Sequence, residues 1–158
     1  MEASQSHDIE NKLSRAWTAL AGWPCDFEPS QTAPQPRRDD ACFLLPICMG
    51  EALPPAGVLV LLGPEDAHEL AAAMFGQAPE ALSAADVRDA CAELCNIFSG
   101  CVIAALDHSG HAELGLPELL DAARSEALCL RASFPVFRAK SEQQHRIAVL
   151  LIDPLHPC

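Results

Sequence analysis

The fold is decided by the segment Asp89-Ala-Cys-Ala-Glu93-Leu-Cys-Asn96-Ile-Phe-Ser-Gly100, which carries a helical pattern with two faces. Each helical residue advances about 100° around the axis, so residues three and four positions apart share a face. One face holds a polar stripe: Asp89, Glu93, Asn96 and Gly100. The opposite face holds apolar residues: Cys91, Leu94, Cys95, Phe98 and Val102. The segment therefore predicts a helix that packs on a core through one side and presents a carboxylate and a carboxamide on the other.

The limits of this helix follow from the residues around it. Ser83-Ala-Ala-Asp86 is a capping box, which marks a helix start, and we expect the helix to run to about Leu106. A second helix is predicted over residues 64–75. Pro64 suits a first helical turn, acidic residues favour the positive end of the helix dipole, and Gly76 can end the helix.

Apolar runs on both sides of these helices predict strands. Residues 41–48 and 57–62 are expected to form an antiparallel pair. Pro46 should lie at an edge or a bulge, because proline cannot donate a ladder hydrogen bond. Residues 126–137 and 145–152 are expected to form two closing strands.

The remaining segments complete the expected order. Residues 8–22 carry apolar groups at helical spacing and predict an N-terminal helix, whereas residues 24–40 show no periodicity and predict a long, flexible loop. Residues 107–115 are rich in turn formers, and residues 117–123 suit either a short helix or an irregular segment. This order favours the α+β class, with a mostly antiparallel twisted sheet and long helices packed on it, in a single domain over residues 1–158.

Composition and charge exclude several classes of function. The chain has 158 residues, of which 50% are hydrophobic, so it can bury a substantial core. A net charge of −12 argues against nucleic-acid binding and favours a partner with basic groups. The polar start is no secretory signal, and the apolar runs at 57–62 and 147–152 are too short to cross a bilayer. We expect a cytoplasmic protein that does not bind membranes and keeps its thiols reduced.

The polar stripe offers chemistry at three positions. Asn96 has an amide that can donate one hydrogen bond and accept another, as is needed to orient a water molecule. Glu93 can accept a hydrogen bond or pair with a cation. Gly100 costs about 1 kcal/mol in a helix interior relative to alanine, and its lack of a side chain would let another backbone approach. A polar helix face that is simply solvated is the alternative.

The wider pattern resembles the signature of the CheC/CheX/FliY family, whose members dephosphorylate the receiver domain of the chemotaxis response regulator. That signature has an Asp or Ser, a Glu four residues later, an Asn three further on and a more distant Pro. Asp89, Glu93 and Asn96 match it, and Pro117 is the nearest match to the proline, slightly closer to Asn96 than the family's spacing. Residues 41–153 fit a CheX-like arrangement. The N-terminal helix has no second Glu-x-x-Asn, which is similar to one-site CheX rather than to two-site CheC.

This resemblance implies a CheX-like phosphatase that acts on the phosphoaspartate of a CheY-like receiver domain. Asn96 would orient the attacking water, Glu93 would pair with the receiver's lysine, and Asp89 and Gly100 would contact the partner. No metal or cofactor is implied on this chain, because the receiver holds the Mg²⁺. The resemblance also implies a homodimer. The competing hypothesis is a non-catalytic CheX-like module that uses the same face to bind a two-component signalling partner.

Two other clusters suggest thiol or metal chemistry, and with it a sensor function. Cys91, Cys95 and Cys101 lie close together along the helix, but Cys91 and Cys95 share its apolar face and no Cys-x-x-Cys pair exists, which favours buried, inert thiols. His108 and His111 lie in a glycine-containing turn without obvious further ligands, which favours an exposed loop over a metal site.

Overall fold

The computed structural model describes residues 1–48, 56–106, 112–141 and 145–152. Within these ranges the chain forms four α-helices: α1 (Ala3–Ala21), α2 (Pro64–Phe75), α3 (Ala84–Leu106) and α4 (Ala122–Cys129). A short 3₁₀ helix, η1 (Pro79–Ala81), lies between α2 and α3. The strands are β1 (Phe27–Ser30), β2 (Ala41–Cys48), β3 (Ala56–Leu62), β4 (Glu113–Leu114), β5 (Glu118–Leu119), β6 (Ala132–Ala139) and β7 (Ile147–Ile152).

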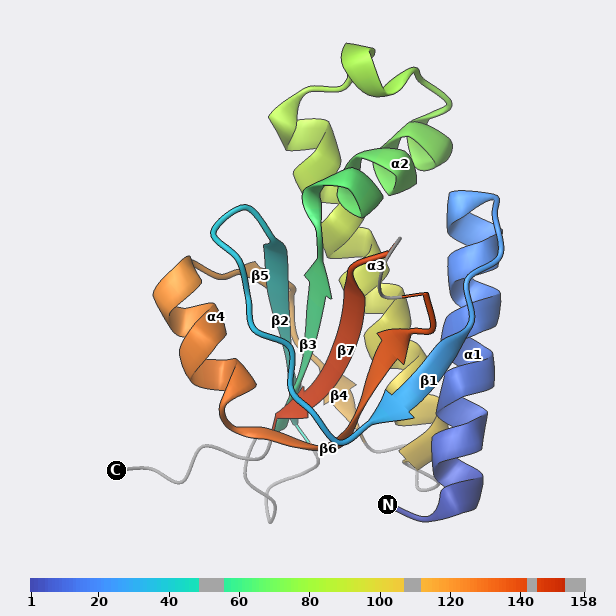
Figure 1. Cartoon of the computed structure of the whole chain (residues 1–158), viewed down its shortest axis with the longest axis vertical. Coiled ribbons are helices and arrows are strands. Elements are labelled where there is room, and N and C mark those ends of the chain that lie inside the picture. Colours follow the sequence, from blue (N-terminus) through green and yellow to red (C-terminus); the bar gives the residue numbers. More distant parts are fainter. Residues whose placement is uncertain (49–55, 107–111, 142–144, 153–158) are drawn as a thin grey trace.

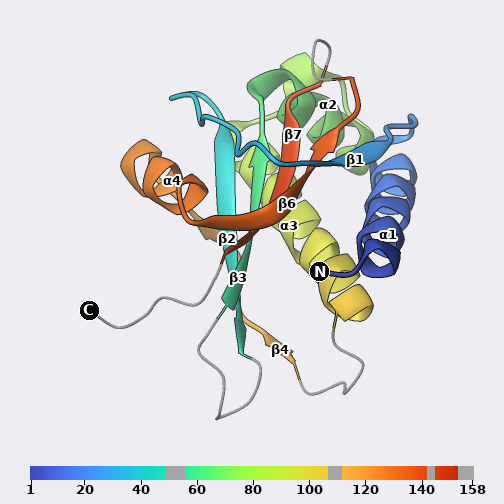
Figure 2. The same ribbon diagram turned by 60° about the horizontal axis from the view of Figure 1, so that its bottom comes forward.

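The strands form one sheet with helices on both faces. Its order is β1-β6-β7-β3-β2-β4, and β5 also pairs with β2. Every pairing is antiparallel. Helices α1, α2 and α3 lie on one face, and α4 lies on the other (Figures 1 and 2). The predicted α+β class with an antiparallel sheet is therefore confirmed.

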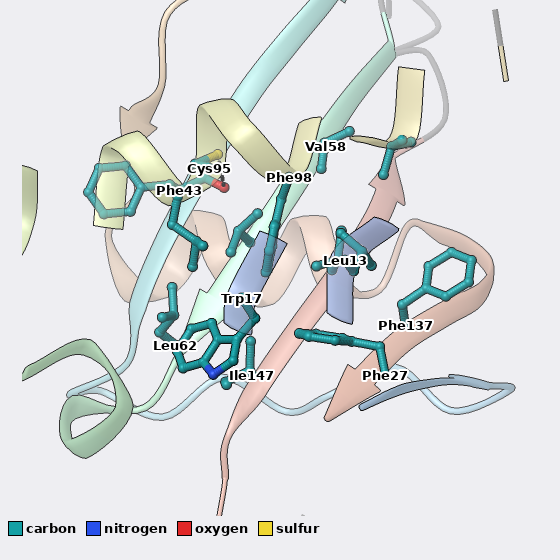
Figure 3. Close-up of a cluster of buried hydrophobic side chains, with 14 of the residues drawn as sticks. Leu13, Trp17, Phe27, Phe43, Val58, Leu62, Cys95, Phe98, Phe137 and Ile147 are labelled. Atoms are coloured by element: carbon teal, nitrogen blue, oxygen red, sulfur yellow. Dashed lines mark hydrogen bonds between the residues drawn. The ribbon is translucent and has the colours of Figure 1, made fainter. Parts of the chain in front are cut away.

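The central strand β3 is buried on both of its faces. The residues of β3 that face the three-helix layer are Val58, Val60 and Leu62. Those that face the side of α4 are Leu59 and Leu61. Figure 3 shows the larger core, in which Trp17 from α1 and Phe98 from α3 pack over the sheet. A continuous apolar run such as that of β3 is typical of a strand covered on both sides.

Helix α3 is the core helix of the three-helix layer. Eight of its residues are buried: Ala90, Cys91, Leu94, Cys95, Phe98, Ser99, Val102 and Ala105. It contacts α1, α2, β2 and β3. By length and composition alone α3 would also suit a membrane span, since its most apolar window has a mean hydropathy of 1.5. The core helix of a folded domain can have the same length and composition.

Two predictions made for segments outside the main helices are wrong. Residues 24–40, expected to be a loop, contain β1, because the ring of Phe27 is buried against Phe98 with centroids 5.5 Å apart. The strand expected over residues 126–137 begins only at Ala132, because helix α4 occupies its first residues. Asp121 caps that helix by accepting a hydrogen bond from the Arg124 N–H at 2.8 Å.

Other boundaries move by a few residues. Helix α1 begins at Ala3 rather than near residue 8, because the Glu2 N–H donates to Gln5 Oε1 at 3.0 Å and starts the helix earlier. The segment after α3 adds two strands of two residues each, β4 and β5, which the sequence pattern did not indicate. Helix α2 and strand β2 begin and end at the predicted residues.

Pro46 is accommodated without lying on an outer strand. Strand β2 pairs with β3 on one side and with β4 and β5 on the other. The Pro46 carbonyl accepts from the Gly115 N–H at 2.8 Å, so its backbone polar groups face the break between β4 and β5. The missing N–H of proline therefore falls where no strand needs it.

Phe98→Ala should lower the free energy of unfolding by about 3–5 kcal/mol, because it leaves a cavity where a fully buried ring packs between α3 and the sheet. Phe75→Ala is the matched control, since Phe75 in α2 is 44% exposed and should cost only about 1 kcal/mol. Denaturant unfolding followed by circular dichroism measures both. A loss at Phe98 no larger than that at Phe75 would contradict the core position of α3.

Candidate functional site

The polar stripe lies on the side of α3 that faces away from the sheet. At 100° per residue its four positions fall within roughly 60° of arc, and the buried stripe is centred about 180° from them. Asp89 and Glu93 are exposed, and Asn96 and Gly100 are half-buried. The structure thus brings together on one surface the four residues that the sequence singled out.

Hydrogen bonds at the start of α3 fix its first turn, and the polar stripe follows directly from that turn. The Ser83 N–H donates to Asp86 Oδ2 at 2.8 Å, and the Asp86 N–H donates to Ser83 Oγ at 3.1 Å, which confirms the predicted capping box. The backbone N–H of Ser83, together with its hydroxyl, holds the pKa of the Asp86 carboxyl below its usual value. Asp86 is therefore ionised at neutral pH at the positive end of the helix dipole, and the stripe begins at Asp89, three residues on.

Glu93 and Asn96 are uncommitted side chains close to one another. They are separated by about 4.5 Å along the helix axis. Among the residues that the structure describes, neither side chain makes a hydrogen bond or an ion pair. A carboxylate only accepts, whereas a carboxamide both donates and accepts. The pair therefore offers two different kinds of contact to an incoming molecule.

Gly100 keeps one end of the stripe open. A Cβ atom added at this position would meet nothing within 4 Å, so packing inside the chain does not require glycine here. Its effect is to lower the surface beside Asn96, which suits close approach by a second molecule. Because a helix surface is convex, the stripe cannot enclose a reacting group by itself. Any chemistry at this site needs a partner surface.

Pro117 lies on a different element from the stripe. It is half-buried and stands between β4 and β5, which border β2. The pairing of β4 and β5 with β2 fixes the position of Pro117, whereas α3 fixes the position of the polar stripe. The match of Pro117 to the family's distal proline stays a prediction.

The cysteines on the inner face of α3 are packed as small apolar residues. Cys91 and Cys95 are buried, and burial raises the pKa of each thiol to about 12. The Cys95 thiol donates to the Phe43 carbonyl at 3.7 Å. Across the described ranges, no group of three or more His, Cys, Asp or Glu residues is placed to hold a metal ion. His108 and His111 lie outside the described residues.

Comparisons with known proteins point to one family. The family model described as "Chemotaxis phosphatase CheX" matches residues 48–137, which is more than half of the chain. This match includes β3, α2 and the whole of α3. No curated protein matches the chain significantly by sequence.

Several solved structures share the fold at low sequence identity. The CheX protein of Vibrio vulnificus is 16% identical, with a TM-score of 0.65 over 95% of this chain and 96% of that one. A chain in the CheX–CheY–BeF3–Mg complex from Borrelia burgdorferi is 11% identical, with a TM-score of 0.66 over 92% and 95% of the two chains. A chain in the FliM–SpeE complex from H. pylori is 8% identical, with a TM-score of 0.61 over 98% and 90%. At these identities the likeness establishes the fold alone.

Gly100→Ala should raise the free energy of unfolding by about 0.5–1 kcal/mol, because alanine is the better helix former and its Cβ meets no atom here. Gly63→Ala, just before α2, is the contrasting variant and should lower stability, since its Cβ would lie 2.9 Å from Arg146 Cβ, an atom that cannot swing away. Denaturant titration compares the two. If Gly100→Ala is destabilised, the glycine serves internal packing and not docking.

Iodoacetamide should modify the exposed Cys48 of the native protein well before Cys91 and Cys95. The thiolate is the reactive form of cysteine, and burial keeps these two thiols both protonated and inaccessible at pH 8. Peptide mass mapping after timed reaction separates the sites, with denatured protein as the control in which all three react. Rapid native modification of Cys91 would support the thiol-sensor hypothesis instead.

Proposed function

Because the chain belongs to the CheX family of chemotaxis proteins, we propose that it is a phosphatase that accelerates hydrolysis of the phosphoaspartate of a response-regulator receiver domain. The observation that carries this proposal is the outward-facing pair of Glu93 and Asn96 on α3. The two side chains are close together and make no hydrogen bond or ion pair with the described residues, as expected of groups whose partners arrive on another protein.

Asn96 would position the attacking water. Hydrolysis of an acyl phosphate needs a water molecule in line with the bond that breaks, and catalysis of phosphoryl transfer depends mainly on such positioning and on electrostatics. The carboxamide oxygen would accept a hydrogen bond from the water. This orients the water so that a lone pair of its own oxygen points at phosphorus. The amide N–H would donate to a phosphoryl oxygen. No covalent intermediate on this chain is needed.

Glu93 would hold the receiver in register. Its exposed carboxylate is suited to a charge-assisted hydrogen bond with a lysine of the receiver. The net charge of −12 on the chain would speed the approach of a partner whose docking surface carries basic groups. The Mg²⁺ that such receivers use would belong to the partner and would neutralise charge on the phosphoryl group.

Asp89 and Gly100 would border the reactive pair on either side. Asp89 is exposed at the start of the stripe, where it can contact the partner. Gly100 leaves open space beside Asn96, which would let a receiver loop reach the carboxamide. The complex of CheX with CheY from Borrelia burgdorferi supports a CheY-like partner for this chain. Homodimerisation and a cytoplasmic location stay predictions.

The second candidate is a non-catalytic interaction module that binds a signalling partner through the same face of α3. It is favoured by the likeness to a chain of the FliM–SpeE complex, since the fold also occurs in an assembly that is not described as a CheX–CheY pair. Both candidates use the polar stripe. They differ in whether Asn96 accelerates the loss of phosphate or contributes only to binding.

Asn96→Ala should reduce the acceleration of phosphate loss by about 100-fold or more, because the water loses its orienting group. Glu93→Ala should reduce it by about tenfold, mainly by weakening docking, which a higher concentration for half-maximal rate would reveal. The assay follows release of labelled phosphate from purified phosphorylated CheY-like receivers, with and without this chain.

Asn11→Ala is the matched control for Asn96→Ala, because Asn11 is an exposed asparagine on a different helix, α1. It should leave the rate unchanged. Full activity in Asn96→Ala would overturn the proposed mechanism. Wild-type protein that binds phosphorylated receivers without accelerating phosphate loss would establish the interaction module.

A further inference from the structure

A cluster of polar and aromatic side chains lies where the end of α1, the start of α2 and the start of β7 meet, at one end of the sheet (Figure 1). Its centre is the carboxylate of Asp66 in the first turn of α2, a residue that is only 4% exposed. A carboxylate at this depth needs partners, because taking a charge out of water is costly unless the charge is paired and hydrogen-bonded. The polar stripe on α3 makes no use of Asp66.

Both oxygens of Asp66 contact the two residues that precede β7. His145 Nδ1 lies 2.9 Å from Oδ1, and the Arg146 backbone N–H donates to Oδ2 at 2.6 Å. Because a carboxylate only accepts, Nδ1 carries the hydrogen of the first bond. The Gly63 N–H donates to the Arg146 carbonyl at 2.7 Å, so the chain just before α2 is attached at the same place. Asp66 therefore fastens the first turn of α2 to the start of β7.

The imidazole of His145 also packs on an aromatic ring from the segment after α1. It stacks on Trp23, with ring centroids 4.3 Å apart and ring planes 29° apart. Trp23 in turn meets Trp17 edge to face, with centroids 5.1 Å apart, and Trp17 belongs to the main core. The His145 side chain is 22% exposed and lines a pocket of about 500 Å³ beside the segment 33–37, so protons can reach it from solvent.

The other charged and titratable groups around His145 favour or oppose a positive charge on its ring. Those in the described chain are Asp66, Cys25 and the arginines that line the same pocket: Arg37, Arg138 and Arg146. Burial, and then the charges of Asp66 and Asp26, raise the pKa of the Cys25 thiol to about 11, so this thiol stays neutral below pH 8. Among these residue types, histidine is the one that exchanges a proton near neutral pH.

Protonation of His145 would change two of its contacts at once. The neutral ring donates one hydrogen bond to Asp66, whereas the imidazolium would form an ion pair with that carboxylate. The positive ring would also lie against the face of Trp23, an arrangement that attracts cations. The arginines in the pocket oppose the added charge, although buried Asp40 offsets that of Arg146 by ion pairing with it. Asp66 is the group in direct contact with the ring.

We propose that Asp66 and His145 form a proton-dependent clasp. Protonation of His145 tightens the attachment of the first turn of α2 to β7, and loss of the proton loosens it. Helix α2 contacts α3, so the clasp makes the support of the helix that carries the polar stripe responsive to pH. The phosphatase proposal does not depend on the clasp, because neither residue lies on the stripe.

A double-mutant cycle with Asp66→Asn and His145→Gln tests the clasp. The coupling between the two positions, measured by urea unfolding of the whole chain, should be favourable at pH 6 and smaller by about half at pH 8.5. Asp66→Asn keeps an acceptor for the Arg146 N–H and removes the charge. His7→Gln is the matched control, since His7 is an exposed histidine near the start of α1, and its coupling to Asp66→Asn should be close to zero at both pH values.

Tryptophan emission gives a second readout, made on the native protein. Trp17 and Trp23 are the two tryptophans of the chain, and both belong to this cluster. An imidazolium quenches an indole on which it stacks, so emission should fall reversibly from pH 8.5 to pH 6 in the wild type and in His7→Gln, but not in His145→Gln.

Constant wild-type emission over this range would overturn the proposal. A fall in emission that survives in His145→Gln, or a coupling that does not change with pH, would overturn it as well. If Asp66→Asn does not fold, the emission of His145→Gln decides alone. Loss of phosphatase activity would leave each of these results unchanged.

Discussion

Burial of the apolar stripe of α3 against β2 and β3 is the constraint on which the rest of the structure depends. Phe98 and Cys95 are fully buried, and Phe98 also holds Phe27 of β1 against the same core. A helix that buries one side has no freedom to rotate about its axis. Fixing the apolar stripe therefore fixes Glu93 and Asn96 on the outside, at a defined height above the sheet.

The sheet separates the polar stripe of α3 from the face on which α4 lies. The face that carries α3 presents carboxylates and a carboxamide, whereas the far face holds the pocket lined by Arg37, Arg138 and Arg146. The central strand β3 contributes side chains to the hydrophobic clusters on both faces of the sheet.

The sequence was sufficient for the elements whose signals are local. The capping box at Ser83 and the glycine at 76 mark helix ends, and the alternation of polar and apolar residues places the stripe on the outer face of α3. The strand β1 and the short strands β4 and β5 were missed because their hydrogen-bond partners lie far away in the chain, and two to four residues carry no periodicity. Helix α4 was mistaken for strand because the apolar residues at its end outweighed the cap at Asp121.

The candidate site and the pocket on the far face of the sheet differ in the same way. The four residues of the stripe lie within three turns of one helix, so their proximity follows from spacing alone. Arg37, Arg138 and Arg146 line one pocket although they come from the segment after β1, from β6 and from the residue before β7, and only tertiary contacts bring them together.

The most direct test of the role of α3 is a structure of this chain bound to a receiver domain activated with BeF3 and Mg²⁺. We predict that α3 lies across the active site of the receiver, with the Asn96 carboxamide within hydrogen-bonding distance of the beryllofluoride or of a water in line with it. Glu93 should pair with a lysine of the receiver. A complex in which the receiver binds elsewhere and Asn96 faces solvent would contradict this function for the stripe.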